Sequence, residues 1–277
     1  MERRRKPGGA LQVSEVGNAV REIIQGKLRE IEEKENVRIL CAVESGSRAW
    51  GFASPDSDYD VRFIYLRTPE DYLLLKPKRD VIEWQLDETL DINGWDISKT
   101  LKLLYRANPT VFEWLHSPIV YRESLELDSL RLLSQRYFSP RKNLYHYWHM
   151  AEQAYKTHLQ TERVRIKKYF YVLRPILCAK WVIERKSIPP VPFSELVQSE
   201  LEGAMRPIVE ELVELKGRTP EIGTAPQIKP LHRYIDGALK EIRFCADHMQ
   251  EEKQSDWSAL DAYFLSLLRQ RETGNTL

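Results

Sequence analysis

The sequence predicts an α+β fold in which a head of strands and helices precedes an all-helical second half. Short apolar segments with β-branched residues, typical of strands, fall before about residue 125. Beyond that point apolar residues recur at helical spacing, and Pro and Gly gather at the breaks over 186–193 and 216–230. We therefore expect a disordered basic tail over 1–13, a first domain over 14–125 and a helical domain over 126–277.

The head is expected to begin with a helix and a buried strand. Apolar residues from Val16 to Ile31 recur at helical spacing between charged residues, which predicts an amphipathic helix over 14–35. The next segment, VRILCAV (37–43), is short, apolar and partly β-branched, which favours a strand buried on both faces.

A second strand is expected over 59–65, because its residues alternate in character. Successive side chains of a strand point to opposite faces of the sheet. One face of this strand is predicted to carry Asp58, Asp60, Arg62 and Ile64, and the other Tyr59, Val61, Phe63 and Tyr65.

Turn and capping residues place the remaining elements. Thr68 and Pro69 start a helix, and the segments 80–86 and 89–97 form a hairpin. Ser98 then caps a helix that ends before Pro109. The helices of the second half are expected at 128–137, 141–160, 163–185, 194–215, 231–250 and 256–271.

Composition excludes several classes of protein. The net charge of +1 over 277 residues gives no global basic field, so any site for a polyanion has to be local. No run of apolar residues approaches the roughly 20 of a membrane span. Three cysteines far apart in the chain favour buried thiols in a reducing cytoplasm over a zinc site or disulfides.

The segment from Gly46 to Asp60 carries the strongest chemical pattern. Gly46 and Ser47 follow the first strand, where backbone N–H groups and the serine hydroxyl can hold a phosphate and glycine allows a close approach. Asp58 and Asp60 come ten residues later, two apart on a strand, so their side chains point the same way about 7 Å apart. Carboxylates at this spacing suit one or two Mg²⁺ ions, which prefer oxygen ligands shared with substrate phosphates. Alone, the acids are also compatible with an ordinary turn before a strand.

These residues resemble the Gly-Ser and Asp-x-Asp signature of the DNA polymerase beta superfamily. Four stretches resemble more closely its RlaP type, RNA-ligase-associated polymerases linked to RNA repair. They are ESGSRAWGF (44–52), LDINGWDISKTLKLL (90–104), NPTVFEWLHSPIVY (108–121) and KKYFYVLRPILCAKW (167–181). The resemblance implies a polymerase-β-like mixed sheet with a helical domain closing over the nucleotide. It also implies that Gly46 and Ser47 hold triphosphate and that Asp58 and Asp60 bind metal, Mg²⁺ or alternatively Mn²⁺.

The superfamily pattern also implies a third carboxylate on a later strand, acting on the attacking hydroxyl. We expect Asp96 in this role, with Asp91 as its competitor. Strict alternation puts the two on opposite faces of the strand, so one of them is an ordinary surface acid. Gly94 between them is a candidate bulge that would change this parity. Glu44 is expected behind the phosphate turn, either orienting Arg48 or Arg62 or simply paired with a neighbouring base.

Further nucleotide-binding residues are expected beside the turn and on a helix of the second half. Arg48 follows the Gly-Ser turn directly. In KKYFYVLRPIL (167–177), Lys167, Tyr171 and Arg174 share one helical face and Lys168 lies at its side. We expect Lys168 and Arg174 to contact phosphate, with a solvated basic face as the alternative. Pro175 is expected to bend or break the helix.

The sequence therefore predicts a Mg²⁺-dependent nucleotidyltransferase that moves a nucleoside monophosphate from an NTP, most simply ATP, to a hydroxyl acceptor. The RlaP resemblance favours an RNA 3′ end as acceptor. Two alternatives stay open. One is adenylylation of a protein, as in antitoxins of the minimal-nucleotidyltransferase type. The other is a non-catalytic nucleotide-binding module, against which an intact set of mutually repelling acids argues.

Overall fold

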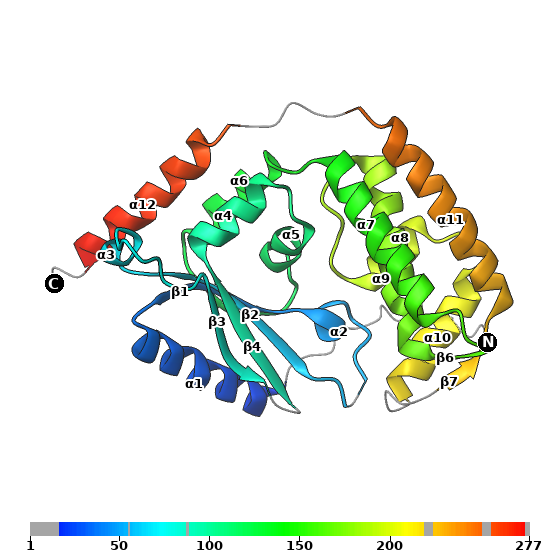
Figure 1. Ribbon diagram of the computed structural model, residues 1–277. Helices are drawn as coiled ribbons and strands as arrows, with labels where there is room; N and C mark the ends of the chain where they lie inside the picture. Colours follow the sequence, from blue (N-terminus) through cyan, green and yellow to red (C-terminus); the bar gives the residue numbers. More distant parts are fainter. Residues whose placement is uncertain (1–16, 55, 87–88, 219–223, 251–255, 275–277) are drawn as a thin grey trace, which may run out of the picture.

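A five-stranded mixed sheet forms the centre of the first half of the chain, with helices against both of its faces (Figure 1). The computed structural model describes residues 17–54, 56–86, 89–218, 224–250 and 256–274. The strands are β1 (Arg38–Glu44), β2 (Tyr59–Leu66), β3 (Val81–Leu86), β4 (Leu90–Asp96) and β5 (Val120–Glu123), in the spatial order β3-β4-β2-β1-β5.

One strand pairing in this sheet is parallel, and it positions the candidate site. Strands β2 and β4 run parallel, whereas β1–β2, β1–β5 and β3–β4 are antiparallel. The register of the parallel pair sets Asp60 opposite Asp91 and Tyr65 opposite Asp96. The predicted hairpin of β3 and β4 is confirmed.

The two faces of the sheet are covered by different helices. Helix α1 (Asn18–Glu35) packs Ile24, Leu28 and Ile31 on the face that also carries Val61 and Phe63. The opposite face, with Ile64 and Leu66, is covered by α4 (Ile97–Tyr105), α5 (Pro109–Leu115), α6 (Leu127–Gln135) and α12 (Ser258–Gly274). The alternation predicted for 59–65 is therefore confirmed, and the head has apolar cores on both sides of its sheet.

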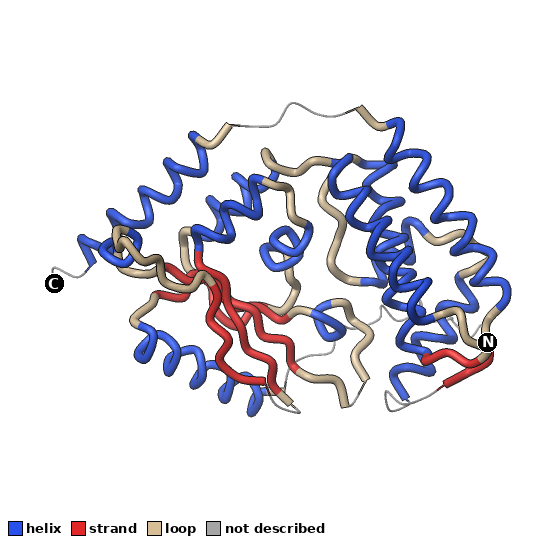
Figure 2. The backbone as a smooth tube through the Cα atoms, in the orientation of Figure 1, coloured by secondary structure: helices blue, strands red, loops and turns tan. Residues whose placement is uncertain are grey.

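The second half is a set of helices around α7 and α8, as the tube in Figure 2 shows. Its elements are α7 (Pro140–His158), α8 (Ile166–Arg185), α9 (Phe193–Glu200), α10 (Arg206–Arg218) and α11 (Lys229–His248), with a small ladder of β6 (Arg163–Arg165) and β7 (Thr224–Pro226). Phe52, from the loop after α2 (Gly46–Ala49), stacks on Phe170 with ring centres 4.7 Å apart. An aromatic residue of the head thus belongs to the helical core.

Several local expectations are corrected by the structure. The helix expected over 194–215 is divided into α9 and α10. Pro175 does not break α8, which continues through it, and a bend at Pro175 stays a prediction. The N-cap of α4 is Asp96, not Ser98. Gly94 pairs in regular register with Phe63 on β2, and a Cβ atom there would lie 2.2 Å from the Phe63 ring. Glycine is needed at this position for close packing and not for a bulge.

Of the remaining expectations, the start of the helix at Thr68–Pro69 is confirmed, whereas the tail and the domain boundary stay predictions. Helix α3 (Pro69–Tyr72) starts at the expected Thr68–Pro69, and all three cysteines are unpaired thiols. The tail over 1–13 lies outside the described residues. The domain boundary at 125 stays a prediction; α12, far beyond it in sequence, packs against α3, α4 and α6.

Candidate functional site

The Gly-Ser turn and Asp60 fit against each other directly. β1 ends at Glu44, and the Ser45 N–H donates to the Asp60 carbonyl at 2.8 Å. Gly46 opens α2 with a φ of +60°, a conformation that side chains strongly disfavour. A Cβ atom at this position would lie 2.1 Å from Asp60 Oδ2. Only glycine therefore lets the Asp60 carboxylate lie against the turn.

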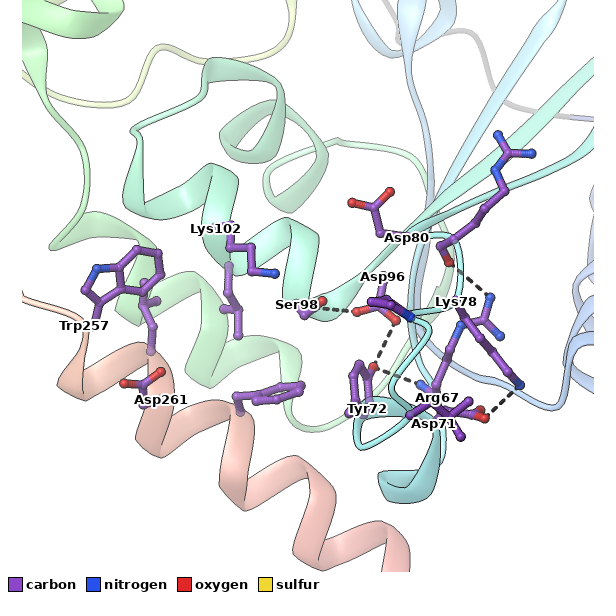
Figure 3. A pocket seen from close by; sticks show the side chains of 16 residues that line it. Arg67, Asp71, Tyr72, Lys78, Asp80, Asp96, Ser98, Lys102, Trp257 and Asp261 are labelled. Atoms are coloured by element: carbon purple, nitrogen blue, oxygen red, sulfur yellow. Dashed lines mark hydrogen bonds and ion pairs between the residues drawn. The ribbon is translucent and has the colours of Figure 1, made fainter.

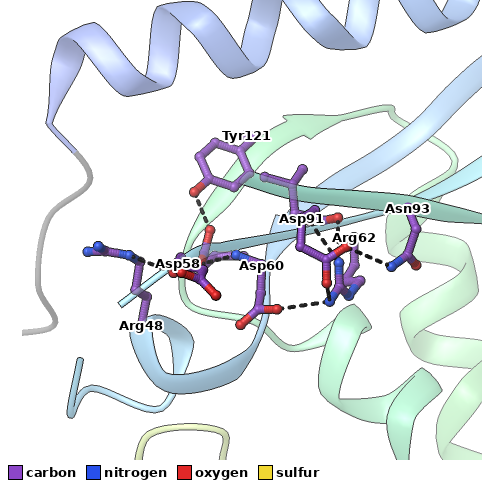
Figure 4. A network of polar contacts seen from close by, with 9 residues as sticks. Arg48, Asp58, Asp60, Arg62, Asp91, Asn93 and Tyr121 are labelled. Carbon is purple, nitrogen blue, oxygen red and sulfur yellow. Dashed lines mark hydrogen bonds and ion pairs between the residues drawn. The ribbon is translucent and has the colours of Figure 1, made fainter. Parts of the chain in front are cut away.

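Asp58, Asp60 and Asp91 lie near this turn, without forming a preformed metal cluster (Figure 4). Asp58 is exposed just before β2, and the side chains of Asp60 and Asp91 are 30% and 27% exposed. Arg62 joins the latter two, with an Nη atom 2.9 Å from Asp60 Oδ1 and 2.6 Å from Asp91 Oδ2. Burial raises the pKa of the Asp60 carboxyl; the charge of Arg62 opposes the shift, and those of Asp91 and Asp58 add to it.

Asp96 is not part of this group. It lies five residues beyond Asp91, about 16 Å along β4 at roughly 3.3 Å per residue. Its Oδ1 accepts from Ser98 N at 2.7 Å and its Oδ2 from the Tyr72 hydroxyl at 3.0 Å. Asp96 is 3% exposed, and burial raises the pKa of its carboxyl.

Asp96 lines a separate cavity of about 500 Å³ together with Trp257 and Asp261 (Figure 3). The choice of Asp96 as third catalytic acid therefore does not fit the structure. Asp91 is the acid that the sheet brings to the Asp58–Asp60 pair.

Arg48 and Glu44 lie behind the aspartates and hold their backbone. Arg48 Nε donates to the Asp58 carbonyl at 3.0 Å, and its guanidinium stacks on the Tyr59 ring at 3.7 Å. Glu44 is fully buried; its Oε1 accepts from Asp60 N at 2.9 Å and its Oε2 from the Tyr121 hydroxyl. Burial raises the pKa of Glu44 to about 7. Both side chains thus bind backbone next to the aspartates: nucleotide binding by Arg48 stays a prediction, and the hydrogen bonds of Glu44 go to Tyr121 and the Asp60 backbone, where we expected a basic residue.

A cavity of about 350 Å³ opens between the turn and the helical half. Ser57 and Asp58 line it with Asp60, and the helices contribute Lys167 and Tyr171 from α8 and Lys216 from α10. Lys216 is 6% exposed, and its Nζ donates to the Phe52 carbonyl at 2.8 Å. The head also contributes Ser45, Gly46, Ser47, Trp50 and Phe52. Acids, a turn with backbone donors and two lysines thus face one space.

Neither Lys168 nor Arg174 lines this cavity. Arg174 is 3% exposed, pairs with Glu113 at 2.8 Å and lies 4.4 Å from the centre of the Trp50 ring. Lys168 places its Nζ 4.8 Å from the centre of the Tyr171 ring. The cavity is lined by Lys167 instead of Lys168 and Arg174. Lys167 is the residue that we had placed on the same helical face as Tyr171 and Arg174. Sequence reasoning missed Lys216 altogether.

The donor set fits a hard divalent cation. Asp58, Asp60 and Asp91 offer only carboxylate oxygens, the ligands that Mg²⁺ prefers. Across the described residues, no three His, Cys, Asp or Glu side chains are gathered as a preformed metal cluster. The Arg62 guanidinium instead neutralises Asp60 and Asp91, and a cation bound by these oxygens would take over that role.

A Gly-Ser turn in contact with Asp60, with Asp91 opposite Asp60 on a mixed sheet, is compatible with a nucleotidyltransferase of the polymerase beta type. The chain belongs to the RNA repair pathway DNA polymerase beta family, RlaP, whose sequence profile matches residues 20–266.

The chain is also similar to two known proteins. The chain is 42% identical over 246 residues to the uncharacterized protein YcgL of Bacillus subtilis (strain 168), an alignment that covers 88% of this chain and 95% of that protein. A nucleotidyltransferase-like protein from Exiguobacterium sibiricum 255-15, known from its crystal structure, aligns over 89% of this chain and 80% of its own. Its identity is 14% and the TM-score is 0.30. In the described part of the chain, no helix is long and apolar enough to span a membrane.

Proposed function

We propose that this protein transfers a nucleoside monophosphate from an NTP, with ATP as the first candidate, to the 3′ hydroxyl of an RNA. The observation that carries the proposal is the parallel register of β2 and β4, which sets Asp91 beside Asp60. Asp58 and Asp60 line one cavity with the Gly46–Ser47 turn, and Arg62 pairs with both Asp60 and Asp91. Membership of the polymerase beta type supports the reaction class.

Asp58 and Asp60 would hold Mg²⁺, with Mn²⁺ as a substitute, and Asp91 completes the acid set. The ion supplies positive charge beside the reacting phosphate and lowers the pKa of an oxygen bound to it. Asp91 would accept the proton of the attacking hydroxyl; in the structure Arg62 contacts its Oδ2 and its backbone carbonyl.

The other cavity residues suit the triphosphate. The backbone N–H groups of the turn and the Ser47 hydroxyl donate to phosphate oxygens. The acceptor oxygen forms a bond to the α-phosphorus, the bond from this phosphorus to its bridging oxygen breaks, and pyrophosphate leaves with the electron pair. Lys167 and Lys216 neutralise the charge that develops on this leaving group.

The RNA acceptor is supported by the RNA repair pathway that the family description names and by local basic residues. Arg163 and Arg165 are exposed on β6, which runs directly into the first turn of α8 and Lys167. A short RNA end passing this edge would meet several cations despite the net charge of +1. Because each phosphate contact releases counterions, transfer should weaken steeply with salt.

The test is transfer of label from each α-labelled NTP, with Mg²⁺, to an RNA oligomer that has a free 3′ hydroxyl. The matched control is the same oligomer with a blocked 3′ end, and a salt series and Lys168→Glu probe the RNA path. We expect label on the free-ended oligomer only, falling with salt and with the charge reversal.

Two other results would contradict the proposal. Label on a co-purifying protein, with none on RNA at low salt, would establish the protein adenylyltransferase alternative. Nucleotide binding without transfer to any acceptor would establish a non-catalytic module.

A further inference from the structure

The Gly46–Ser47 turn is held by the backbone of two aromatic residues that follow it, Trp50 and Phe52. The Trp50 N–H donates to the Gly46 carbonyl at 3.0 Å. The Phe52 N–H donates to the Ser47 carbonyl at 3.1 Å. Because both bonds are made by backbone groups, a shift of either aromatic residue carries the turn with it. We call Trp50 and Phe52 the anchor residues.

The anchor residues are themselves bound to helices of the second half, which α2 faces from the side of the sheet (Figure 1). The Trp50 carbonyl accepts from the N–H of Phe193, the first residue of α9, at 2.8 Å. The Phe52 carbonyl accepts from Lys216 Nζ of α10 at 2.8 Å. The Phe52 ring stacks on Phe170 of α8. Three helices of the second half therefore hold the residues to which the turn is bonded.

Arg174 of α8 supports the ring of Trp50. Its guanidinium carbon lies 4.4 Å from the centre of that ring, and its Nη1 lies 2.8 Å from Glu113 Oε1 on α5. Its Nη2 donates to the Val191 carbonyl at 3.5 Å, just before α9 begins. A guanidinium attracts an aromatic face more strongly when it is removed from water, and Arg174 is buried. Arg174 thus joins Trp50 to both halves of the chain at one point.

The buried Arg174–Glu113 pair is better explained by geometry than by stability. Replacing a buried ion pair with uncharged residues of similar volume is often neutral or stabilising, because desolvation offsets the attraction. The planar guanidinium, in contrast, fixes the position of a ring stacked on it. Arg174 does not line the cavity of the candidate active site, whereas Trp50 does. Any effect of Arg174 on that cavity therefore passes through Trp50.

We propose that Arg174 is a positioning residue for the proposed reaction. By holding Trp50 it keeps the Gly46–Ser47 turn in the place where the turn binds the triphosphate. This inference rests on the proposed function, since it requires that the turn binds phosphate.

The test measures binding of inorganic tripolyphosphate with Mg²⁺ by calorimetry, together with the free energy of unfolding of each variant. Arg174→Leu combined with Glu113→Gln removes both charges, so that neither is left buried without a partner. This double variant should keep the wild-type stability and bind tripolyphosphate about tenfold more weakly. Arg174→Lys keeps a charge for Glu113 without the planar guanidinium, and it should bind tripolyphosphate about threefold more weakly.

The same helix provides a matched control. Arg185 also pairs with a buried glutamate, Glu200, and its guanidinium carbon lies 4.0 Å from the centre of the Trp181 ring. Trp181 does not line the cavity of the candidate active site. Arg185→Leu combined with Glu200→Gln should therefore change tripolyphosphate binding less than about twofold. An equal loss in this control would show that any buried pair on α8 affects binding, which overturns the inference.

A mutant cycle tests whether Arg174 acts through Trp50. If it does, adding Trp50→Leu to the Arg174–Glu113 double variant should weaken binding no more than Trp50→Leu does alone. Additive losses would overturn the inference, as would unchanged affinity in Arg174→Lys or in the double variant, and in each case the proposed function would stand. If the wild-type protein binds no tripolyphosphate, the proposed function fails and the inference fails with it.

Discussion

Replacing Gly46 with alanine should disable the site through one contact. The φ of +60° at Gly46 costs an alanine about 1–2 kcal/mol of folding free energy. Its Cβ would also lie 2.1 Å from Asp60 Oδ2, whereas ordinary contacts begin at 3.4 Å, so the carboxylate has to move by more than 1 Å. A displacement of about 1 Å at a reacting centre can lower turnover roughly 100-fold. We expect a loss of that size in pyrophosphate release.

Gly51→Ala is the matched control for Gly46→Ala. Gly51 has a φ of +82°, and a Cβ atom there would meet nothing within 4 Å. Both variants should lose a similar free energy of unfolding in a denaturant titration, but only Gly46→Ala should lose turnover. Equal turnover in the two variants would refute the argument that Gly46 exists to seat Asp60.

Three further predictions concern the acids and their partners. Asp91→Asn should abolish turnover with little loss of stability, whereas Asp96→Asn should retain turnover and lower the free energy of unfolding; kinetics with the opposite ranking would return the third acid to Asp96. Arg62→Gln should bind Mn²⁺ without nucleotide about tenfold more tightly, as measured by calorimetry, because the competing charge is removed; equal or weaker binding would contradict this. The pKa of Glu44, raised from 4.5 to about 7, means that its stabilising contribution is present below pH 4.5 and is lost as pH rises through 7. The stability of Glu44→Gln relative to wild type should therefore increase across that window, and a constant difference would show that Glu44 does not titrate there.

Local patterns in the sequence predicted much of the fold. The alternation of 59–65 and the hairpin of β3 and β4 follow from residue character over a few positions. The helices of the second half follow from apolar spacing, although the break between α9 and α10 at 201–205 was missed. Gly46 and Asp60 do lie in contact, as their pattern indicated, while their roles in catalysis stay predictions.

The errors at the site arise from long-range packing. Alternation correctly placed Asp91 and Asp96 on opposite faces of β4, but only the register with β2 shows which acid lies beside Asp60. Periodicity likewise grouped Lys167 with Arg174 on α8 without showing that the latter turns toward Glu113. Lys216 lies 164 residues from its partner Phe52, a contact that no local pattern encodes.

The central claim is tested most directly by following label from α-labelled and γ-labelled ATP in parallel reactions with Mg²⁺ and an RNA oligomer bearing a free 3′ hydroxyl. The account predicts that the α label becomes attached to the oligomer while the γ label is released as pyrophosphate, and that both events disappear in Asp58→Asn. Attachment of the γ label, or transfer of the α label undiminished in Asp58→Asn, would contradict it.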